Sequence, residues 1–566
     1  MKLTTTTFII LALFINNSCT NHNESDNSLV INIDFSKKAG EFHSSWAMFG
    51  YDEPNYTYMK DGKKLLSELA ELSPVPVYIR THNLLTSGDG KPALKWGSTN
   101  AYSEDSKGNP VYNWSITDSI FDTYIERNIR PLVEIGFMPK DLSVKPEPYK
   151  HHWRPGAPYE EIYTGWAYPP KNYEKWAELV NQWIIHCIER YGKDEVETWY
   201  WELWNEPNIG YWQGTTEEYL KLYDYTTNAV KSALPTAIIG GPHSTGPSWD
   251  KAELFLRTFL DHVQNGTNYA TGETGSPLDF IAFHAKGRPT LKDSTILMNM
   301  GTQLRDISKG FEIVASYPAF KNTPIIIGEC DPEGCAACSM QDYPENAYRN
   351  GTMYSSYTAA SFPRIYELAD YYDVNLRGIV TWAFEFENQQ WFNGYRDLTT
   401  NGVDKPVLNI FKMFGMMNGQ RVEVTGDLGY NCLSIRDSSV RGTKPDINAM
   451  AILNDSSASI MLWNYHDFNI ISEPVSVQLN LKNIYQGKAK LLHYRVDSES
   501  SNSYTLWKKM GSPQNPTAEQ IKILEESGKL KMINESENLD FESTNAIINI
   551  KIPGQAVSLL IIKWFN

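Results

Sequence analysis

Short apolar runs alternate with amphipathic stretches from about residue 40 to 420. Runs rich in Val, Ile, Tyr and Phe are typical of buried strands, whereas apolar residues spaced by three and four are typical of helices. The predicted strands are residues 47–49, 75–80, 131–135, 196–204, 237–240, 280–283, 324–328 and 378–382. The predicted helices between them include residues 115–125 with Ser115 as a cap, 172–191, 216–234 and 346–369.

This alternation predicts a parallel sheet whose strands are connected by helices. Seven runs are clear, and an eighth strand is available if residues 47–49 supply the first. A doubly wound open sheet is the structural competitor, but it usually carries a Gly-rich phosphate loop after its first strand, and the sequence shows none there. We therefore expect an α/β fold, a (β/α)₈ TIM barrel over residues 41–424.

Beyond about residue 425 the pattern changes to alternating apolar and polar positions separated by turn residues. Runs at 460–463, 475–479, 546–550 and 557–564 predict strands, and the region 425–566 is expected to be an accessory C-terminal antiparallel β-sandwich. A further apolar run at 29–33 precedes the barrel. We expect residues 28–40 to add a strand to that sandwich.

The first residues have the pattern of an export signal. Lys2 is followed by an apolar stretch at 8–15 that is too short to span a bilayer. The following Asn16-Asn17-Ser18-Cys19 resembles a bacterial lipoprotein signal over residues 1–19, with Cys19 as the lipidated residue. Asn16 departs from the aliphatic residue usual at its position, so a plain secretory signal is the alternative. Residues 20–27 would form a polar tether.

These features predict a protein exported to the bacterial cell envelope, as an outer-membrane lipoprotein or a periplasmic protein. The membrane would be contacted only through the N-terminal lipid. The net charge of −16 argues against a nucleic-acid partner, whose phosphates would be repelled. An aromatic content of 13% fits either large cores or platforms for sugar rings. The oligomeric state cannot be predicted from these patterns.

Six cysteines do not make a disulfide scaffold in a chain of 566 residues. Cys330, Cys335 and Cys338 cluster after one predicted strand, and three interpretations stay open for them. They can form a loop with one disulfide, remain buried thiols, or bind a metal. A structural metal site would need four Cys or His ligands, and no convincing fourth is visible, so we expect no metal.

Two predicted strands run into a glutamate. Strand-forming aromatics extend to Trp204, and Pro207 stops the ladder just after Glu206. The run 324–328 is followed directly by Glu329. These would be the fourth and seventh strands, and the carboxyl ends of barrel strands form the catalytic face. Hydrolysis of a glycosidic bond needs two carboxylates and no cofactor, although structural ion pairs are the alternative for both residues.

The run Trp204-Asn205-Glu206-Pro207-Asn208 resembles the acid/base motif of glycoside hydrolase family 39, the family of β-xylosidases and α-L-iduronidases. Residues 50–56, 79–83, 281–287 and 328–332 resemble further strand ends of that family. The resemblance extends over roughly residues 40–420. It implies a retaining enzyme on a (β/α)₈ barrel, in which Glu206 is the acid/base and Glu329 the nucleophile.

The resemblance also implies a set of substrate-binding residues. Asn205 would bond the 2-hydroxyl, and Lys286 would pair with a uronic carboxylate in the iduronidase branch. The implied substrate-binding residues are Asn205, His82, His284, Lys286 and Trp382. Arg396 would assist Lys286, and Glu387 would repel an acidic sugar or bind hydroxyls. Lys95 and Trp96, in a polar loop after the second strand, are further candidates for lining the subsite.

The expected function is a retaining exo-glycoside hydrolase. It would be β-xylosidase-like and act on a plant or host polysaccharide or oligosaccharide by double displacement. The alternatives are an α-L-iduronidase, an arabinosidase or arabinobiosidase, and a transglycosylase. A non-catalytic carbohydrate-binding lipoprotein on an inactive barrel is a further alternative, but a binding protein has no need for both glutamates.

Overall fold

The computed structural model describes residues 28–72, 74–148, 165–426, 429–469 and 473–565. Cys19 and the expected signal and tether, residues 1–27, lie outside the described residues. Within the described part of the chain, no helix has both the length and the apolar character needed to cross a membrane.

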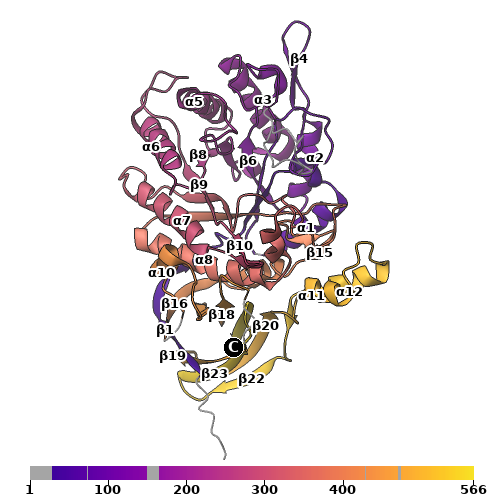
Figure 1. The fold of residues 1–566 in the computed structure, drawn as a ribbon. Coiled ribbons are helices and arrows are strands. Elements are labelled where there is room, and N and C mark those ends of the chain that lie inside the picture. The colour runs from indigo at the N-terminus through magenta and orange to yellow at the C-terminus, as the bar shows by residue number, and fades with distance from the viewer. Residues whose placement is uncertain (1–27, 73, 149–164, 427–428, 470–472, 566) are drawn as a thin grey trace, which may run out of the picture.

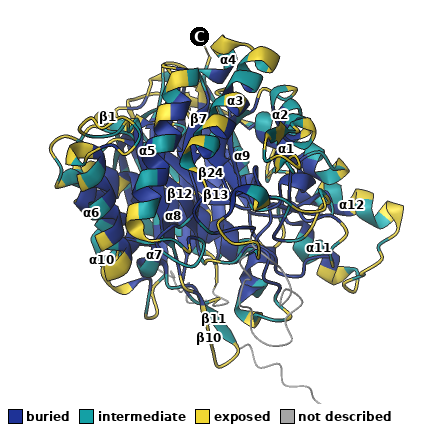
Figure 2. Ribbon diagram, turned by 90° about the horizontal axis from the view of Figure 1, so that it is seen from above, coloured by how far each residue is buried: buried dark blue, intermediate teal, exposed yellow. Residues whose placement is uncertain are grey.

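Eight parallel strands close into a barrel in the order β12-β13-β2-β3-β6-β7-β8-β9, which confirms the predicted fold class. The strands are β2 (Met48–Tyr51), β3 (Tyr78–Thr81), β6 (Arg130–Ile135), β7 (Tyr200–Leu203), β8 (Ile238–Ser244), β9 (Phe280–Lys286), β12 (Ile325–Asp331) and β13 (Leu376–Trp382). Nearly all of their residues are buried, because helices cover the outer face and side chains fill the interior (Figure 2).

Amphipathic helices surround the barrel, with buried faces toward the strands and exposed faces outward (Figures 1 and 2). They are α1 (Lys60–Ala70), α2 (Ser115–Ile125), α3 (Tyr173–Tyr191), α4 (Lys193–Val196), α5 (Thr216–Ala233), α6 (Asp250–Asn265), α7 (Met300–Ala315), α8 (Thr352–Tyr372) and α9 (Leu408–Gly415). Their ends follow local chemistry. The Asn172 side chain accepts a hydrogen bond from the Lys175 N–H at the start of α3, and Thr215 forms a capping box with Glu218 on α5.

Three element boundaries differ from the sequence-based expectation. The run 196–204 is not one strand, because residues up to Val196 form α4 and β7 begins only at Tyr200. The expected helix 346–369 is split into a 3₁₀ segment, Pro344–Asn350, and α8, because Gly351 between them has an extended backbone. Ser115 is the first residue of α2 rather than its cap, and its N–H donates to the Asn113 side chain at 3.2 Å.

A second sheet of ten strands lies beside the barrel (Figure 1). Its strands are β1 (Leu29–Phe42), β16 (Gly419–Gly426), β17 (Asp446–Leu453), β18 (Ser457–Tyr465), β19 (Val475–Lys482), β20 (Gly487–Val496), β21 (Lys531–Met532), β22 (Glu537–Phe541), β23 (Asn545–Ile552) and β24 (Ala556–Trp564). Most neighbours are antiparallel, but β1 pairs antiparallel with β16 and parallel with β19. Apolar residues from across the sheet, including Ile33, Leu479 and Ile562, share one core.

Helix α8 joins the two parts of the molecule. It packs against α7 of the barrel layer on one side and against β18 and β24 of the second sheet on the other. Tyr357 of α8 meets Tyr465 of β18 with ring centroids 5.8 Å apart, and Arg364 forms a buried ion pair with Asp446 of β17 at 3.2 Å. One continuous apolar core therefore runs from the barrel into the inner face of the sheet.

The remaining elements are hairpins and helices that belong to neither the barrel strands nor the ten-stranded sheet. They are the hairpins β4 (Tyr102–Glu104) with β5 (Pro110–Tyr112), β10 (Thr290–Lys292) with β11 (Thr295–Leu297), and β14 (Thr399–Thr400) with β15 (Val403–Asp404), the short helical segments η1 (Pro54–Tyr56), η2 (Lys140–Leu142) and η3 (Pro344–Asn350), and the helices α10 (Cys432–Ser438), α11 (Ser503–Lys509) and α12 (Ala518–Gly528).

Candidate active site

Glu206 and Glu329 lie at the carboxyl ends of the fourth and seventh barrel strands. Glu329 is part of β12, and Glu206 follows β7 in an unusual backbone conformation. Trp204 and Glu206 both have positive φ, 70° and 44°, a region that non-glycine residues rarely occupy. The Glu206 N–H donates to the His243 carbonyl at 3.0 Å, which helps to hold the turn. Such backbone strain is found mainly at functional sites.

The two glutamates and His284 form one compact group. Each contributes a nitrogen or oxygen atom, and these atoms all lie within 4.8 Å of one another. His284 Nδ1 is 2.9 Å from Glu206 Oε1 and 3.7 Å from Glu329 Oε1. One oxygen of the Glu206 carboxylate and one oxygen of the Glu329 carboxylate therefore lie within 4.8 Å of each other.

The surroundings of Glu329 favour its ionised form. Burial alone would raise the pKa of this carboxyl, but the positive charges of Lys286 and Arg80 hold it well below its usual range. The Lys286 ammonium contacts Oε2 directly, and Arg80 Nη1 donates to Oε1 at 3.2 Å. At neutral pH the side chain is therefore a carboxylate, the form needed in a nucleophile.

The surroundings of Glu206 favour its protonated form. Burial and the nearby negative charge of Glu329 raise the pKa of Glu206 to about 7, and Lys286 only partly opposes this rise. Burial also lowers the pKa of His284 well below its usual value, so this imidazole is neutral. Depending on the tautomer, the Nδ1 of a neutral His284 can accept a hydrogen bond from the protonated Glu206 or donate one to the Glu206 carboxylate.

Arg80 is the centre of a buried layer below the two glutamates. Its guanidinium is fully buried and bonds Glu202 at 2.6 Å and Glu134 at 3.4 Å in addition to Glu329. Its Nη2 also donates to the Asn205 Oδ1 at 3.1 Å. This bond fixes the orientation of the Asn205 amide, because only the oxygen can accept, and it leaves the Nδ2 as a donor for a ligand.

His82 is held between two carboxylates. Its Nδ1 is 2.6 Å from Asp52 and its Nε2 is 2.8 Å from Glu134. Burial would lower the pKa of His82, but Glu134 and Asp52 outweigh it and raise the value to about 9. The 2.8 Å approach of Arg80 Nη1 to Nε2 is then a contact between two donors, since Nε2 carries a proton shared with Glu134. Both ring nitrogens are thus used within the protein.

Trp382 and Lys286 complete the inner wall. The Trp382 ring lies 4.2 Å from the His82 ring, and the Arg80 guanidinium lies 4.9 Å from its centroid. Its backbone N–H donates to Asp331 at 3.0 Å, and Asp331 is also 3.5 Å from the Lys286 ammonium. The sequence-derived site residues Asn205, His82, His284, Lys286 and Trp382 therefore gather around the two glutamates. Four of them make a polar contact with one of the glutamates or with Arg80, and Trp382 contacts Arg80 through its ring.

Arg396 and Glu387, expected beside an acidic sugar, have other partners. Arg396 is fully buried, and it bonds the Trp382 carbonyl at 2.9 Å, Asp331 at 3.5 Å and the carboxylate of Glu333. Glu387 accepts from the backbone N–H groups of Asp61 and Gly62 in the first turn of α1. Its carboxylate therefore satisfies a helix N-terminus, which the sequence analysis did not foresee.

The three clustered cysteines divide into a disulfide and a thiol. Cys335 and Cys338 are bonded, with their Cα atoms 5.5 Å apart, whereas Cys330 is a buried free thiol 3.4 Å from the Gln303 amide. In the described part of the chain, the group of His, Cys, Asp and Glu close enough to hold an ion is Glu206 with His284 and Glu329, and it contains no cysteine. The cluster therefore contains one disulfide and one buried thiol, which combines two of the three interpretations.

Glu134, Glu202 and Asp331 have no role in the sequence-based expectation, and Arg80 falls there only within the motif at 79–83. A signal was present, because each is a charged residue within or at the end of an otherwise apolar run. In a parallel barrel such positions are buried, and buried charges are paired. Glu134 and Glu202 are direct register partners on β6 and β7, so both carboxylates fall in one layer with Arg80.

Comparisons with known proteins identify the family of the chain. The chain is 25% identical over 521 residues to a β-xylosidase of Caldicellulosiruptor saccharolyticus, covering 88% of this chain and 92% of that one. It is 23% identical over 446 residues to the α-L-iduronidase of Mus musculus, covering 73% and 62%. The fold matches a monomeric β-xylosidase of Caulobacter crescentus CB15 with a TM-score of 0.72 and 21% identity, covering 95% and 100%. The family described as glycosyl hydrolases family 39 matches residues 29–536, and with two glutamates at the ends of its fourth and seventh barrel strands the chain belongs to that family.

Proposed function

We propose that this glycoside hydrolase is a retaining, exo-acting enzyme with β-xylosidase-like specificity. The observation that carries the proposal is the pair Glu206 and Glu329, whose nearest oxygen atoms lie within 4.8 Å and whose pKa values are shifted in opposite directions. A retaining mechanism requires both conditions, because one group must donate a proton while the other attacks as an anion.

In the first step the ionised Glu329 attacks the anomeric carbon, and Glu206 gives its proton to the leaving oxygen. The product of this step is a covalent glycosyl-enzyme, with the sugar esterified to Glu329. In the second step Glu206, now a carboxylate, takes a proton from water, and the resulting hydroxide equivalent displaces Glu329 from the sugar. His284 stays neutral through the cycle and bonds Glu206 in either of its protonation states.

Asn205 provides a contact that strengthens in the transition state. Because Arg80 engages its Oδ1, its Nδ2 is the atom available to the 2-hydroxyl next to the reacting carbon. Trp382, packed on His82 and Arg80, gives the glycone an apolar surface. The protein contributes these groups already oriented, so little reorganisation is needed at the moment of reaction.

The ion pairs around Lys286 favour a neutral glycone over a uronic acid. The Lys286 ammonium already contacts Glu329 and Asp331, and Arg396 is buried against Asp331 and Glu333. A uronic carboxylate would have to compete with these internal carboxylates for both cations. An α-L-iduronidase activity is the second candidate, supported by the likeness to the mouse enzyme.

We also propose that the protein is exported to the bacterial cell envelope and is tethered there through Cys19. The support is the sequence pattern of residues 1–27 alone. Palmitate labelling of the wild-type protein and of Cys19→Ala in a bacterial host tests this. Label in the wild type that is lost in the variant is expected, and an unlabelled, released wild-type protein would contradict it.

The experiment for the reaction itself combines a substrate panel with product stereochemistry. Aryl β-xyloside, arabinopyranoside, galactoside, fucoside and α-L-iduronide are compared by kcat/KM, and the first sugar released from the preferred substrate is followed by proton NMR. We expect the xyloside to be preferred and β-xylose to form first, before mutarotation. Release of α-xylose would exclude double displacement, and preference for the iduronide would favour the second candidate.

A further inference from the structure

Lys95 is a buried lysine outside the catalytic group, in the loop that follows β3. Only 6% of the residue is exposed, which is rare for lysine. Its backbone has a φ of 69°, and its N–H donates to the Glu53 carboxylate at 2.6 Å. Glu53 lies two residues after the end of β2. The Lys95 backbone is therefore held on the β2 side of the barrel mouth, the end of the barrel at which the carboxyl ends of the strands lie.

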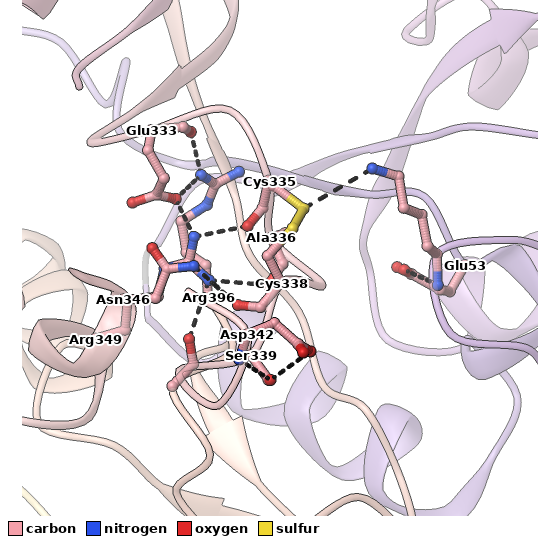
Figure 3. Close-up of a disulfide and its surroundings, with 12 residues drawn as sticks. Glu53, Glu333, Cys335, Ala336, Cys338, Ser339, Asp342, Asn346, Arg349 and Arg396 are labelled. Carbon is pink, nitrogen blue, oxygen red and sulfur yellow. Dashed lines mark hydrogen bonds and ion pairs between the residues drawn. A yellow bond between two sulfur atoms is a disulfide. The ribbon is translucent and has the colours of Figure 1, made fainter. Parts of the chain in front are cut away.

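The side chain of Lys95 extends from the β2 side of the barrel mouth toward the loop that contains Cys335. Its ammonium lies 3.9 Å from the sulfur of Cys335. Cys335 belongs to the loop that follows β12, which Figure 3 shows in close-up. In the barrel β2 and β12 are separated by β13, the strand that ends at Trp382. Because all of these loops leave the carboxyl ends of parallel strands, the lysine spans part of the mouth from the β2 side to the β12 side.

Hydrogen bonds and a disulfide fix the loop that the Lys95 ammonium contacts. The buried Arg349 donates to the Cys335 carbonyl at 2.6 Å, the Ala336 carbonyl at 3.2 Å and the Cys338 carbonyl at 3.0 Å. The Arg396 N–H adds a bond to the Ala336 carbonyl at 2.9 Å. The Cys335–Cys338 disulfide closes the same turn. The Lys95 ammonium therefore contacts a loop whose position is fixed by these bonds.

The charges around Lys95 relate it to the catalytic centre. Burial lowers the pKa of Lys95 to about 8, and the carboxylates that oppose this shift are Asp52, Glu53, Glu329 and Glu206. Contacts connect Asp52 to the catalytic centre, because the His82 ring that Asp52 bonds also lies 3.6 Å from Glu329 Oε1 through its Nε2. Asp52, the first of these carboxylates, keeps 18% of its side chain exposed while it bonds His82. The Lys95 ammonium, a cationic donor, and the Asp52 carboxylate, an anionic acceptor, thus lie on the same side of the barrel mouth.

We propose that Lys95 is a specificity-determining residue that donates hydrogen bonds to a hydroxyl group of the glycone, remote from the reacting carbon, while Asp52 accepts from the neighbouring hydroxyl. A donor and an acceptor side by side match the two oxygens of a vicinal diol. Lys286 lies on β9, four strand positions from β3, and contacts Glu329 instead. This inference rests on the proposed function and deepens it, because it names two neighbouring hydroxyl groups as the part of the sugar that is recognised.

The competing explanation is that Lys95 only supports the disulfide loop. Both roles predict some loss of activity on substitution, but only sugar recognition depends on which hydroxyls the substrate carries. The test therefore compares Lys95→Met, which keeps the length and apolar stem of the side chain, with Lys91→Met, an exposed position of the same loop. Each is assayed with the preferred aryl glycoside and with its 3-deoxy and 4-deoxy derivatives.

We expect Lys95→Met to raise KM for the parent glycoside by about 10–100-fold, the usual range for a hydrogen bond to a charged group, with a smaller effect on kcat. Lys91→Met should match the wild type. With one of the two deoxy substrates the Lys95→Met effect should disappear, because the hydroxyl that the ammonium binds is already absent. Equal losses on the parent and both deoxy substrates would overturn the inference and leave the loop-supporting role.

Failure of this inference can be told apart from failure of the proposed function. If the wild type hydrolyses no glycoside of the panel, the free sugars are titrated while intrinsic fluorescence of the 17 tryptophans is followed. Weaker sugar binding by Lys95→Met than by Lys91→Met would support recognition by Lys95 even then. Unchanged sugar affinity in Lys95→Met would overturn it whether or not the wild type is active.

Discussion

The two glutamates at the barrel mouth are the same residue type, at the ends of strands of the same sheet, and yet their pKa values are shifted in opposite directions. Glu329 is contacted by Lys286 and Arg80, and its pKa is well below its usual range. Glu206 is contacted by the neutral His284, and burial raises its pKa to about 7. Burial penalises the charge of both, so the difference comes from where the cations lie.

This comparison shows that the sequence position of a carboxylate does not determine its role. The cations that ionise Glu329 come from β3 and β9, neither of which is adjacent to it in the chain. The charge of Glu329 is in turn one reason why Glu206 stays protonated. The two roles are therefore coupled, and changing one side of the pair should affect the other.

The largest effect is expected from removing Glu329, the proposed nucleophile. Glu329→Gln keeps the size of the side chain but cannot form the glycosyl-enzyme, so kcat should fall by roughly 10⁴-fold or more. Steady-state kinetics on the preferred aryl glycoside measure this. Residual activity within tenfold of the wild type would show that Glu329 is not the nucleophile.

A smaller and substrate-dependent effect is expected at the acid/base. Glu206→Gln removes the proton donor, which contributes roughly 10²–10⁴-fold in typical enzymes. The loss should be large for a poor leaving group such as methanol and much smaller for dinitrophenol, which leaves without protonation. A loss of equal size for both leaving groups would contradict the assignment of Glu206 as general acid.

The wild-type pH profile and one substitution test the coupling between the glutamates. Activity should fall as pH rises through about 7, because Glu206 then loses the proton that it must donate. Lys286→Met removes a charge that lowers the pKa of both glutamates, so both limbs of the kcat/KM profile should move to higher pH. Lys292→Met, on the exposed β10, is the control and should leave the profile unchanged. Movement of only one limb would mean that Lys286 does not act on the pair.

The smallest effect is expected at a third carboxylate near the mouth. Glu387→Ala removes an acceptor for the first turn of α1, and should cost about 1 kcal/mol of the free energy of unfolding. The wild-type and variant enzymes are compared by urea denaturation and by kcat/KM. Unchanged kinetics with reduced stability would separate this structural glutamate from the catalytic two, whereas a rise in KM would place it at the sugar.

The barrel and the two glutamates could be predicted because both depend on local pattern. Buried parallel strands are short apolar runs, and a glutamate at the end of such a run lies on the catalytic face wherever the barrel closes. The partners could not be predicted, because Arg80, Glu134 and Glu202 meet only through the register of three neighbouring strands. Glu387 shows the same limit, since its partners on α1 are more than 300 positions away in the chain.

Strand β1 has a consequence for how the chain reaches its native state. It is synthesised first, yet its two neighbours are β16, which follows the whole barrel, and β19, which is made later still. The ion pair of Lys37 with Glu423 joins residues 386 positions apart. The apolar side chains of Ile31, Ile33 and Phe35 therefore stay without their final partners until almost the entire chain has emerged, and long-range pairing of this kind is slow. We expect the early strand to be the segment that most needs protection from aggregation before folding is complete.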